Sequence, residues 1–201
     1  MNHFIEVLAG LLEYPGEGWS DRLERCEQWL PSQEPEVAGQ FIGFRRKAGE
    51  LSISKLQELY TQTFDLNPVC TLDIGYHLFG ENYKRGELLA NLRQTEAHYR
   101  LGQENQLPDY LPVLLRLLLK LEDEDLCRSL MGELLVPALD AMLKSFGQAR
   151  NPYRDLIEVI SCALRNEAPE ATAASLNRDT PEVPELYRIS SNASSRSDGR
   201  R

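Results

Sequence analysis

The chain has 201 residues, of which 42% are hydrophobic and 26% are charged. These values are typical of a folded globular protein and exclude a chain that is disordered throughout or collagen-like. The 31 acidic residues outnumber the 22 basic residues and give a formal net charge of −9. Negative charge repels phosphate and anionic lipid, so nucleic acid is not an expected partner and a basic peptide is favoured.

Apolar residues recur at helical spacing along most of the chain, and no stretch alternates as a strand would, so the predicted class is all-α. We expect a single globular bundle of about seven to nine helices over residues 1–165. A flexible tail is expected over residues 166–201, because it has too few apolar residues to offset the entropy lost on ordering. In chain order, the predicted helices cover residues 3–13, 20–30, 37–51, 54–64, 83–101, 111–121, 122–146 and 152–164, and residues 71–79 are expected to form a short apolar segment.

Helix starts are predicted from residue types whose side chains accept hydrogen bonds from free backbone N–H groups. We expect Ser20, Ser54, Asp109 and Asn151 to cap the helices at whose starts they lie. Ser54 also fits the spacing of a capping box. Pro137 falls inside a long apolar pattern, so a kink or a break is expected there.

The four cysteines, Cys26, Cys70, Cys127 and Cys162, lie far apart and form no CxxC pair. This spacing is not that of a zinc or iron–sulfur site and favours buried thiols in a reducing compartment. The N-terminus lacks the basic region of a signal peptide, and the leucine run Leu111–Leu121 is too short to span a bilayer. We therefore expect a cytoplasmic protein without stable membrane insertion.

Motifs for catalysis are lacking. The three histidines, His3, His77 and His98, form no HExxH pattern, and the glycines of Gly75–Gly86 lack the order of a phosphate-binding loop. The prediction is that the protein is not an enzyme and holds no cofactor. Acid–base pairs that are assembled only in space remain an open alternative.

Aromatic and acidic residues are concentrated between Leu59 and Gly86. Aromatic side chains supply large rigid contact area, and neighbouring carboxylates select a positive partner. The alternative for any one of these residues is a place in a tight turn between helices. The residues concerned are Tyr60, Phe64, Asp65, Asp73, Tyr76, Phe79, Glu81 and Tyr83.

Several short motifs occur in a distinctive order. They are Leu11-Leu12-Glu13-Tyr14-Pro15, Thr63-Phe64-Asp65, Gly75 through Phe79-Gly80, Arg85-Gly86 and Leu107-Pro108-Asp109-Tyr110-Leu111. This order resembles the NarJ branch of the TorD/DmsD/NarJ molybdoenzyme assembly chaperones, over about residues 3–165. The sequence departs from the family at Tyr110, where many relatives carry His. It also lacks the Gly-Pro that follows Phe64 in the TorD branch.

The resemblance implies a system-specific chaperone for the apo catalytic subunit of a molybdenum oxidoreductase, commonly a nitrate reductase. Such proteins hold the N-terminal segment of that subunit and assist molybdopterin cofactor insertion before membrane attachment or export. The implied partner is therefore that segment, with weak self-association into a dimer as a further expectation. The residues expected to bind the partner are Tyr60, Phe64, Asp65, Phe79, Gly80, Glu81, Tyr83, Arg85, Gly86, Pro108, Asp109 and Tyr110.

Two other functions share most of these patterns. A general helical interaction or regulatory module would have the same periodicity and charge without the family motifs. A nucleotide- or pterin-handling enzyme would need a phosphate-binding motif that the sequence lacks. Under the chaperone interpretation, an amphipathic client helix is expected to lie in a groove near Tyr60, Phe64 and Phe79.

Overall fold

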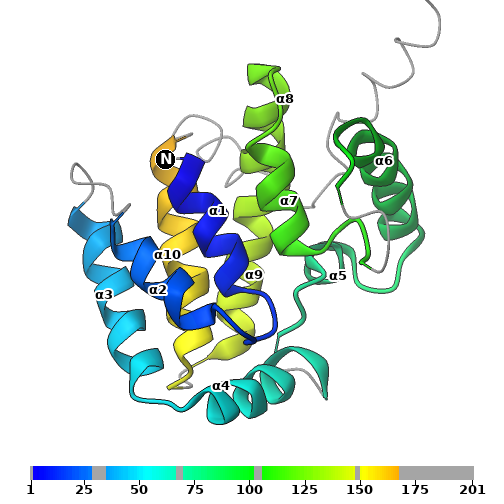
Figure 1. Ribbon diagram of the computed structural model, residues 1–201. Coiled ribbons are helices and arrows are strands. Elements are labelled where there is room, and N and C mark those ends of the chain that lie inside the picture. The colour runs from blue at the N-terminus through cyan, green and yellow to red at the C-terminus, as the bar shows by residue number, and fades with distance from the viewer. Residues whose placement is uncertain (1, 29–34, 67–69, 102–105, 148–149, 168–201) are drawn as a thin grey trace, which may run out of the picture.

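The computed structural model describes residues 2–28, 35–66, 70–101, 106–147 and 150–167. Within these residues the regular elements are all helical, which confirms the predicted class (Figure 1). The predicted tail lies outside the described residues except for its first two, which end the last helix. The elements are α1 (Asn2–Leu11), α2 (Trp19–Gln28), α3 (Pro35–Gly49), α4 (Ile53–Tyr60), η1 (Thr61–Asp65), α5 (Ile74–Phe79), α6 (Tyr83–Tyr99), α7 (Leu111–Leu118), α8 (Glu124–Ser129), η2 (Leu130–Leu135), α9 (Val136–Phe146) and α10 (Pro152–Glu167).

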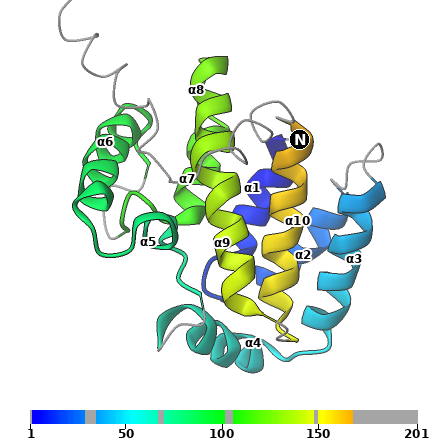
Figure 2. The same ribbon diagram turned by 180° about the vertical axis from the view of Figure 1, so that it is seen from behind.

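One continuous apolar core joins most of these helices. Helix α10 packs on α3, α9 and α1, and α1 packs in turn on α2 and α7. The fully buried rings of Phe4 and Phe41 meet edge to face, and Trp19 meets Phe44 in the same way. Figures 1 and 2 show α5 and α6 at one side of this bundle and α3 at the other.

One of the four predicted N-caps is confirmed and the other three are wrong. Asn151 caps α10 as expected, with its Oδ1 accepting from the Tyr153 N–H at 2.9 Å. The cap of α4 is Ser52 and not Ser54, because the helix begins two residues earlier than its polar pattern suggested. Helix α2 begins at Trp19, so Ser20 lies within it.

The remaining cap, Asp109, is the most consequential correction. Helix α7 begins at Leu111, and the residue at its cap position is Tyr110, whose side chain makes no capping bond. The carboxylate of Asp109 is fully buried and turned toward other segments of the chain.

The acidic run at the start of α8 behaves as expected, because Asp123 accepts from the N–H groups of Asp125 and Leu126.

Two π-helical turns interrupt the regular helices. The turn η2 lies directly before Pro137, so the irregularity predicted at this proline occurs one turn earlier. Proline removes one N–H donor and crowds the preceding turn, and a widened turn accommodates both effects. The turn η1 extends α4, and its Thr63 hydroxyl donates to the Leu59 carbonyl oxygen at 2.6 Å.

Asn151 connects the π turn η1 to the start of α10. Its Nδ2 donates to Thr63 Oγ1 at 2.8 Å, while its Oδ1 caps the helix. Both bonds are buried. Because the residue supplies a donor to one element and an acceptor to the other, it holds the aromatic residues that flank Thr63 against α10.

We predict that Asn151→Ala lowers the free energy of unfolding by about 2 kcal/mol, because it removes a helix cap and a buried hydrogen bond. Asn151→Asp keeps the acceptor and removes only the donor, so its loss is expected to be smaller. Urea unfolding followed by circular dichroism measures both variants. Ser54→Ala, at the exposed position wrongly predicted as a cap, serves as the control. A loss for Ser54→Ala equal to that for Asn151→Ala would contradict the assignment.

Candidate functional site

The predicted site residues come from three segments that meet beside α7. We call this meeting point the Asp109 junction and define it by residues Tyr60–Asp65, Asp73–Gly86 and Pro108–Tyr110. Its backbone is fixed by two hydrogen bonds, from Ile74 N–H to the Asp109 carbonyl and from Leu111 N–H to the Leu72 carbonyl, each 2.9 Å long. Asp73 and Tyr110 form the isolated β-bridge between the segments.

The buried carboxylate of Asp109 joins the first turns of α5 and α6. Its Oδ2 accepts from the Gly75 N–H at 3.1 Å and from Arg85 Nε at 3.0 Å. Asp73 adds a second carboxylate, with its Oδ2 3.5 Å from Arg85 Nη2. Burial lowers the pKa of Arg85, but the two carboxylates more than offset it, and the net pKa is raised. Arg85 is therefore a fixed cation at physiological pH.

Asp73 shows the opposite balance. Its pKa is raised, chiefly by burial and also by the neighbouring Asp109 charge, with Arg85 acting against both. The guanidinium of Arg85 also lies over the ring of Tyr76, 5.8 Å from its centroid. The cation is thus shared between two carboxylates and one aromatic face, which fixes the corner between α5 and α6.

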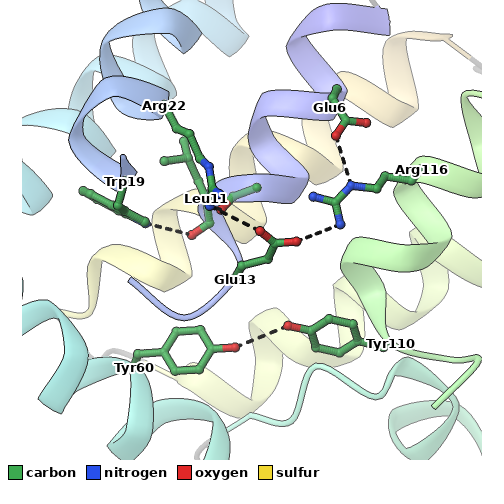
Figure 3. Close-up of polar contacts among 9 residues, drawn as sticks. Glu6, Leu11, Glu13, Trp19, Arg22, Tyr60, Tyr110 and Arg116 are labelled. Atoms are coloured by element: carbon green, nitrogen blue, oxygen red, sulfur yellow. Dashed lines mark hydrogen bonds and ion pairs between the residues drawn. The ribbon is translucent and has the colours of Figure 1, made fainter. Parts of the chain in front are cut away.

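Tyr60 and Tyr110 approach from opposite sides of the junction. Their hydroxyl oxygens lie 3.4 Å apart, and Figure 3 shows the two side chains pointing toward one another. Burial raises the pKa of both hydroxyls, and the nearby Asp65 acts in the same direction. Both tyrosines are therefore neutral hydrogen-bonding groups at physiological pH.

An aromatic cluster lies behind Tyr60. Its ring meets those of Phe64 and Tyr153 at centroid distances of 5.0 and 5.7 Å, both edge to face. Tyr60 and Phe64 are each only 5% exposed, so they support the junction from inside and offer almost no free ring surface.

The other predicted residues lie nearer to solvent. Phe79 is half-buried at the end of α5, and Glu81 is exposed in the turn that follows. Tyr83 is 76% exposed at the start of α6. Gly80 has φ 59° and ψ −148°, a conformation that is almost exclusive to glycine. Its role is to allow the turn between α5 and α6.

The remaining three predicted residues differ in exposure. Asp65 and Gly86 are exposed, and Pro108 is buried. The structure thus unites Tyr60 with Tyr110 and Arg85 with Asp109, while Glu81, Tyr83 and Gly86 face outward.

Two residues were not predicted as site residues: Gly75, within the junction, and Glu96 of α6, outside it but near enough for its charge to interact with Asp109. A Cβ atom at Gly75 would lie 2.7 Å from Asp109 Oδ2 and 3.1 Å from Leu88, so only glycine allows this close approach. Glu96 is fully buried on α6, four residues after the inward-facing Leu92. A charged residue that continues an apolar stripe was a signal available in the sequence.

A Cys–His pair is the arrangement closest to a catalytic dyad. Cys70 Sγ lies 3.7 Å from His77 Nε2. That nitrogen also lies 2.9 Å from the Thr71 carbonyl oxygen, which can only accept, so Nε2 carries the proton and cannot act as a base toward the thiol. Burial raises the pKa of Cys70 to about 12 and lowers the pKa of His77. The pair is therefore structural.

Other chemical features are limited in the part of the chain that the structure describes. No group of three or more metal-ligating side chains is found among those residues. No helix there combines the length and the apolar character needed to cross a membrane. All four cysteines are free thiols, and Cys26 and Cys70 are buried as predicted.

Comparison with known proteins gives two similar groups of relatives. The chain is 28% identical over 164 residues to the probable nitrate reductase molybdenum cofactor assembly chaperone NarJ of Bacillus subtilis. The matched region covers 81% of this chain and 88% of that protein. It is 26% identical over 192 residues to the nitrate reductase molybdenum cofactor assembly chaperone NarJ of Escherichia coli K12, covering 89% and 79% respectively. The same values hold for the protein of Escherichia coli O157:H7. No family model matches the chain.

These relatives confirm the resemblance to the NarJ branch that the motif order indicated. The similarity covers most of the chain and is not confined to one motif. The relatives are named as assembly chaperones, which is consistent with a protein that does not act as a catalyst.

We predict that Gly75→Ala destabilises the protein by about 1–3 kcal/mol, because the added methyl group displaces the buried Asp109 carboxylate from its partners. Gly86→Ala is the matched control, since open space surrounds that position and alanine favours a helix. Thermal unfolding of the two variants gives the comparison. Equal stability of both variants would show that the close approach at Gly75 is not required.

A second prediction concerns Glu96, both of whose oxygens are buried without a hydrogen-bond partner. Burial raises its pKa to about 7, with Asp109 contributing and Arg93 opposing. The unfolded chain ionises this group near its ordinary pKa of about 4.3, so stability present at low pH is lost as pH rises toward 7.

Glu96→Gln should therefore be more stable than the parent protein at pH 8, by up to about 3 kcal/mol, and nearly equal to it at pH 4.5. Urea unfolding at the two pH values measures the difference. A variant whose stability relative to the parent is the same at both pH values would contradict the buried protonation.

Proposed function

We propose that the protein is a cytoplasmic assembly chaperone for a molybdenum-containing, nitrate reductase-like enzyme. It binds the N-terminal segment of the apo catalytic subunit and assists insertion of the molybdopterin cofactor before membrane attachment or export. The observation that carries this proposal is the similarity to NarJ chaperones over 81–89% of the chain.

The Asp109 junction is the proposed docking surface for the client segment. It combines the half-exposed ring of Tyr76, which is 46% exposed, with the outward-facing Tyr83 and the half-buried Phe79. The carboxylates of Asp65 and Glu81 lie at its exposed edge. Aromatic surface beside negative charge suits an amphipathic segment that carries apolar and basic residues. The buried Tyr60 and Phe64 hold this surface in place.

Apolar contact provides most of the binding energy in this mechanism. A client helix that removes about 500 Å² of apolar surface from water gains about 12 kcal/mol before the costs of association and ordering are subtracted. An exposed ion pair adds only about 0.2–1 kcal/mol. The apolar face of the client therefore sets the affinity, while the carboxylates of the junction set its orientation and the rate of encounter.

The chemistry of the junction supports binding rather than catalysis. Its tyrosine hydroxyls are neutral at physiological pH, and the nearest thiol belongs to a buried pair in which the histidine is not a base. The proposed action is to hold the client segment while the apoenzyme matures, with no covalent change in either protein.

Calorimetry with a synthetic peptide tests the proposal. The peptide is the N-terminal segment of the nitrate reductase catalytic subunit from the same organism, and a scrambled peptide of equal composition is the control. We expect saturable binding of the first peptide only, with a negative heat-capacity change and modest sensitivity to salt. Absence of binding, or binding that disappears with salt and lacks a heat-capacity change, would overturn the proposal.

A further inference from the structure

The motif Leu11-Leu12-Glu13-Tyr14-Pro15 has no role in the mechanism above, yet the structure places it against the Asp109 junction. Leu11 and Leu12 are fully buried, and Pro15 is buried on the other side of the turn. The Pro15 carbonyl accepts from Gln57 Nε2 of α4 at 2.7 Å. The turn is thus anchored at both ends, and Glu13 and Tyr14 are the residues that it presents outward.

A chain of alternating charges holds this turn between three helices. Arg116 of α7 lies between Glu6 of α1 and Glu13, at 3.0 and 2.8 Å. The other oxygen of Glu13 lies 3.2 Å from Arg22 Nη1 of α2, which also donates to the Gly10 carbonyl at 3.0 Å. Figure 3 shows Glu13 at the centre, with the Tyr60 and Tyr110 side chains alongside.

Arg116 and Glu13 are the least exposed members of the charge chain. Burial lowers the pKa of Arg116, but Glu6 and Glu13 more than offset it and the net pKa is raised. Arg116 is about one-quarter exposed, so both of its carboxylate contacts are partly shielded from solvent. The backbone on both sides of Glu13 is therefore held with little freedom.

Tyr14 is the exposed end of the aromatic cluster behind the junction. Its ring meets that of Tyr60 edge to face at 5.4 Å, while the side chain as a whole remains 52% exposed. The deeper members, Phe64 and Tyr153, are buried. A large aromatic side chain that is exposed but already fixed loses little entropy when a partner covers it.

We propose that Tyr14 is a contact residue for the client segment and that Glu13 is the positioning residue that holds it, through Arg116 and Arg22. This inference rests on the proposed function and extends its docking surface to the N-terminal turn. The occupant is a client segment in which an apolar residue covers the Tyr14 ring. Asp65, which is exposed at the end of η1, offers its carboxylate to a neighbouring basic residue of that segment.

Photo-crosslinking tests the contact directly. Tyr14 is replaced by p-benzoylphenylalanine in the full chain, and the product is irradiated with the client peptide used for calorimetry. The matched control carries the same group at Ile42, which is 57% exposed and belongs to α3, the helix on the side of the bundle away from α5 and α6. We expect a crosslink to the peptide from position 14 and none from position 42.

Affinity measurements separate the contact from the positioning role. Tyr14→Ala should weaken peptide binding about tenfold, because a preorganised aromatic contact is lost, whereas Tyr14→Phe should stay within about twofold. Glu13→Gln should weaken binding about threefold and reduce the crosslink yield from position 14. Each variant is checked by thermal unfolding, so that binding is compared only among folded proteins.

The outcomes distinguish this inference from the proposed function. If the peptide does not bind the unaltered protein, the proposed function fails. If the peptide binds but position 14 gives no crosslink and Tyr14→Ala binds as tightly as the parent, the role of Tyr14 is overturned and the proposed function stands. If Tyr14 crosslinks but Glu13→Gln changes neither yield nor affinity, the positioning role of Glu13 is overturned.

Discussion

The buried carboxylate of Asp109 is the constraint on which the candidate site depends. One oxygen receives the N–H of Gly75 and the Nε of Arg85, so a single residue fixes the starts of α5 and α6 relative to α7. A buried anion is tolerated only where charged and backbone donors replace its hydration. The cation that satisfies Asp109 also orders the ring of Tyr76, and the geometry of the proposed docking surface follows from that pairing.

The Asp109 junction differs from the core of the bundle because polar contacts hold it together. The contacts among α1, α3, α9 and α10 are mainly apolar, with the ion pairs Lys47–Asp155 and Arg165–Asp140 beside them, whereas the first turn of α6 meets the body through the buried carboxylate of Asp109. Several buried polar atoms lack hydrogen bonds in this region. They include Asp109 Oδ1 and Arg85 Nη2 in the junction and both carboxylate oxygens of Glu96 on α6. Each of these groups carries a desolvation penalty, which the hydrogen bonds to Asp109 Oδ2 have to offset.

Periodicity predicted most helices because their inner faces are regular, as with Val37, Phe41, Phe44 and Ala48 on α3. Periodicity could not show whether Asp109 caps α7 or bonds to distant segments of the chain. A Pro-Asp pair before an apolar run has the local signature of a helix cap, and the observed partners of Asp109, Arg85 and Gly75, lie 24 and 34 residues away. The two π-helical turns were not predicted, because one extra residue in a turn does not disturb a 3.6-residue apolar pattern enough to be seen in the sequence.

The hydroxyl contact between Tyr60 and Tyr110 is one that a client could replace under the proposed function. At 3.4 Å the bond is long, and both groups are neutral, so breaking it carries a smaller penalty than breaking the short charged contact of Arg85 with Asp109. Under the proposed function, a client backbone that offers a donor or an acceptor competes for the hydroxyl of the partly exposed Tyr110, while the pair of Arg85 and Asp109 stays closed. In this proposal the ion pair of Arg85 and Asp109 keeps the helices in position, and the neutral contact between Tyr60 and Tyr110 is the one that a client replaces.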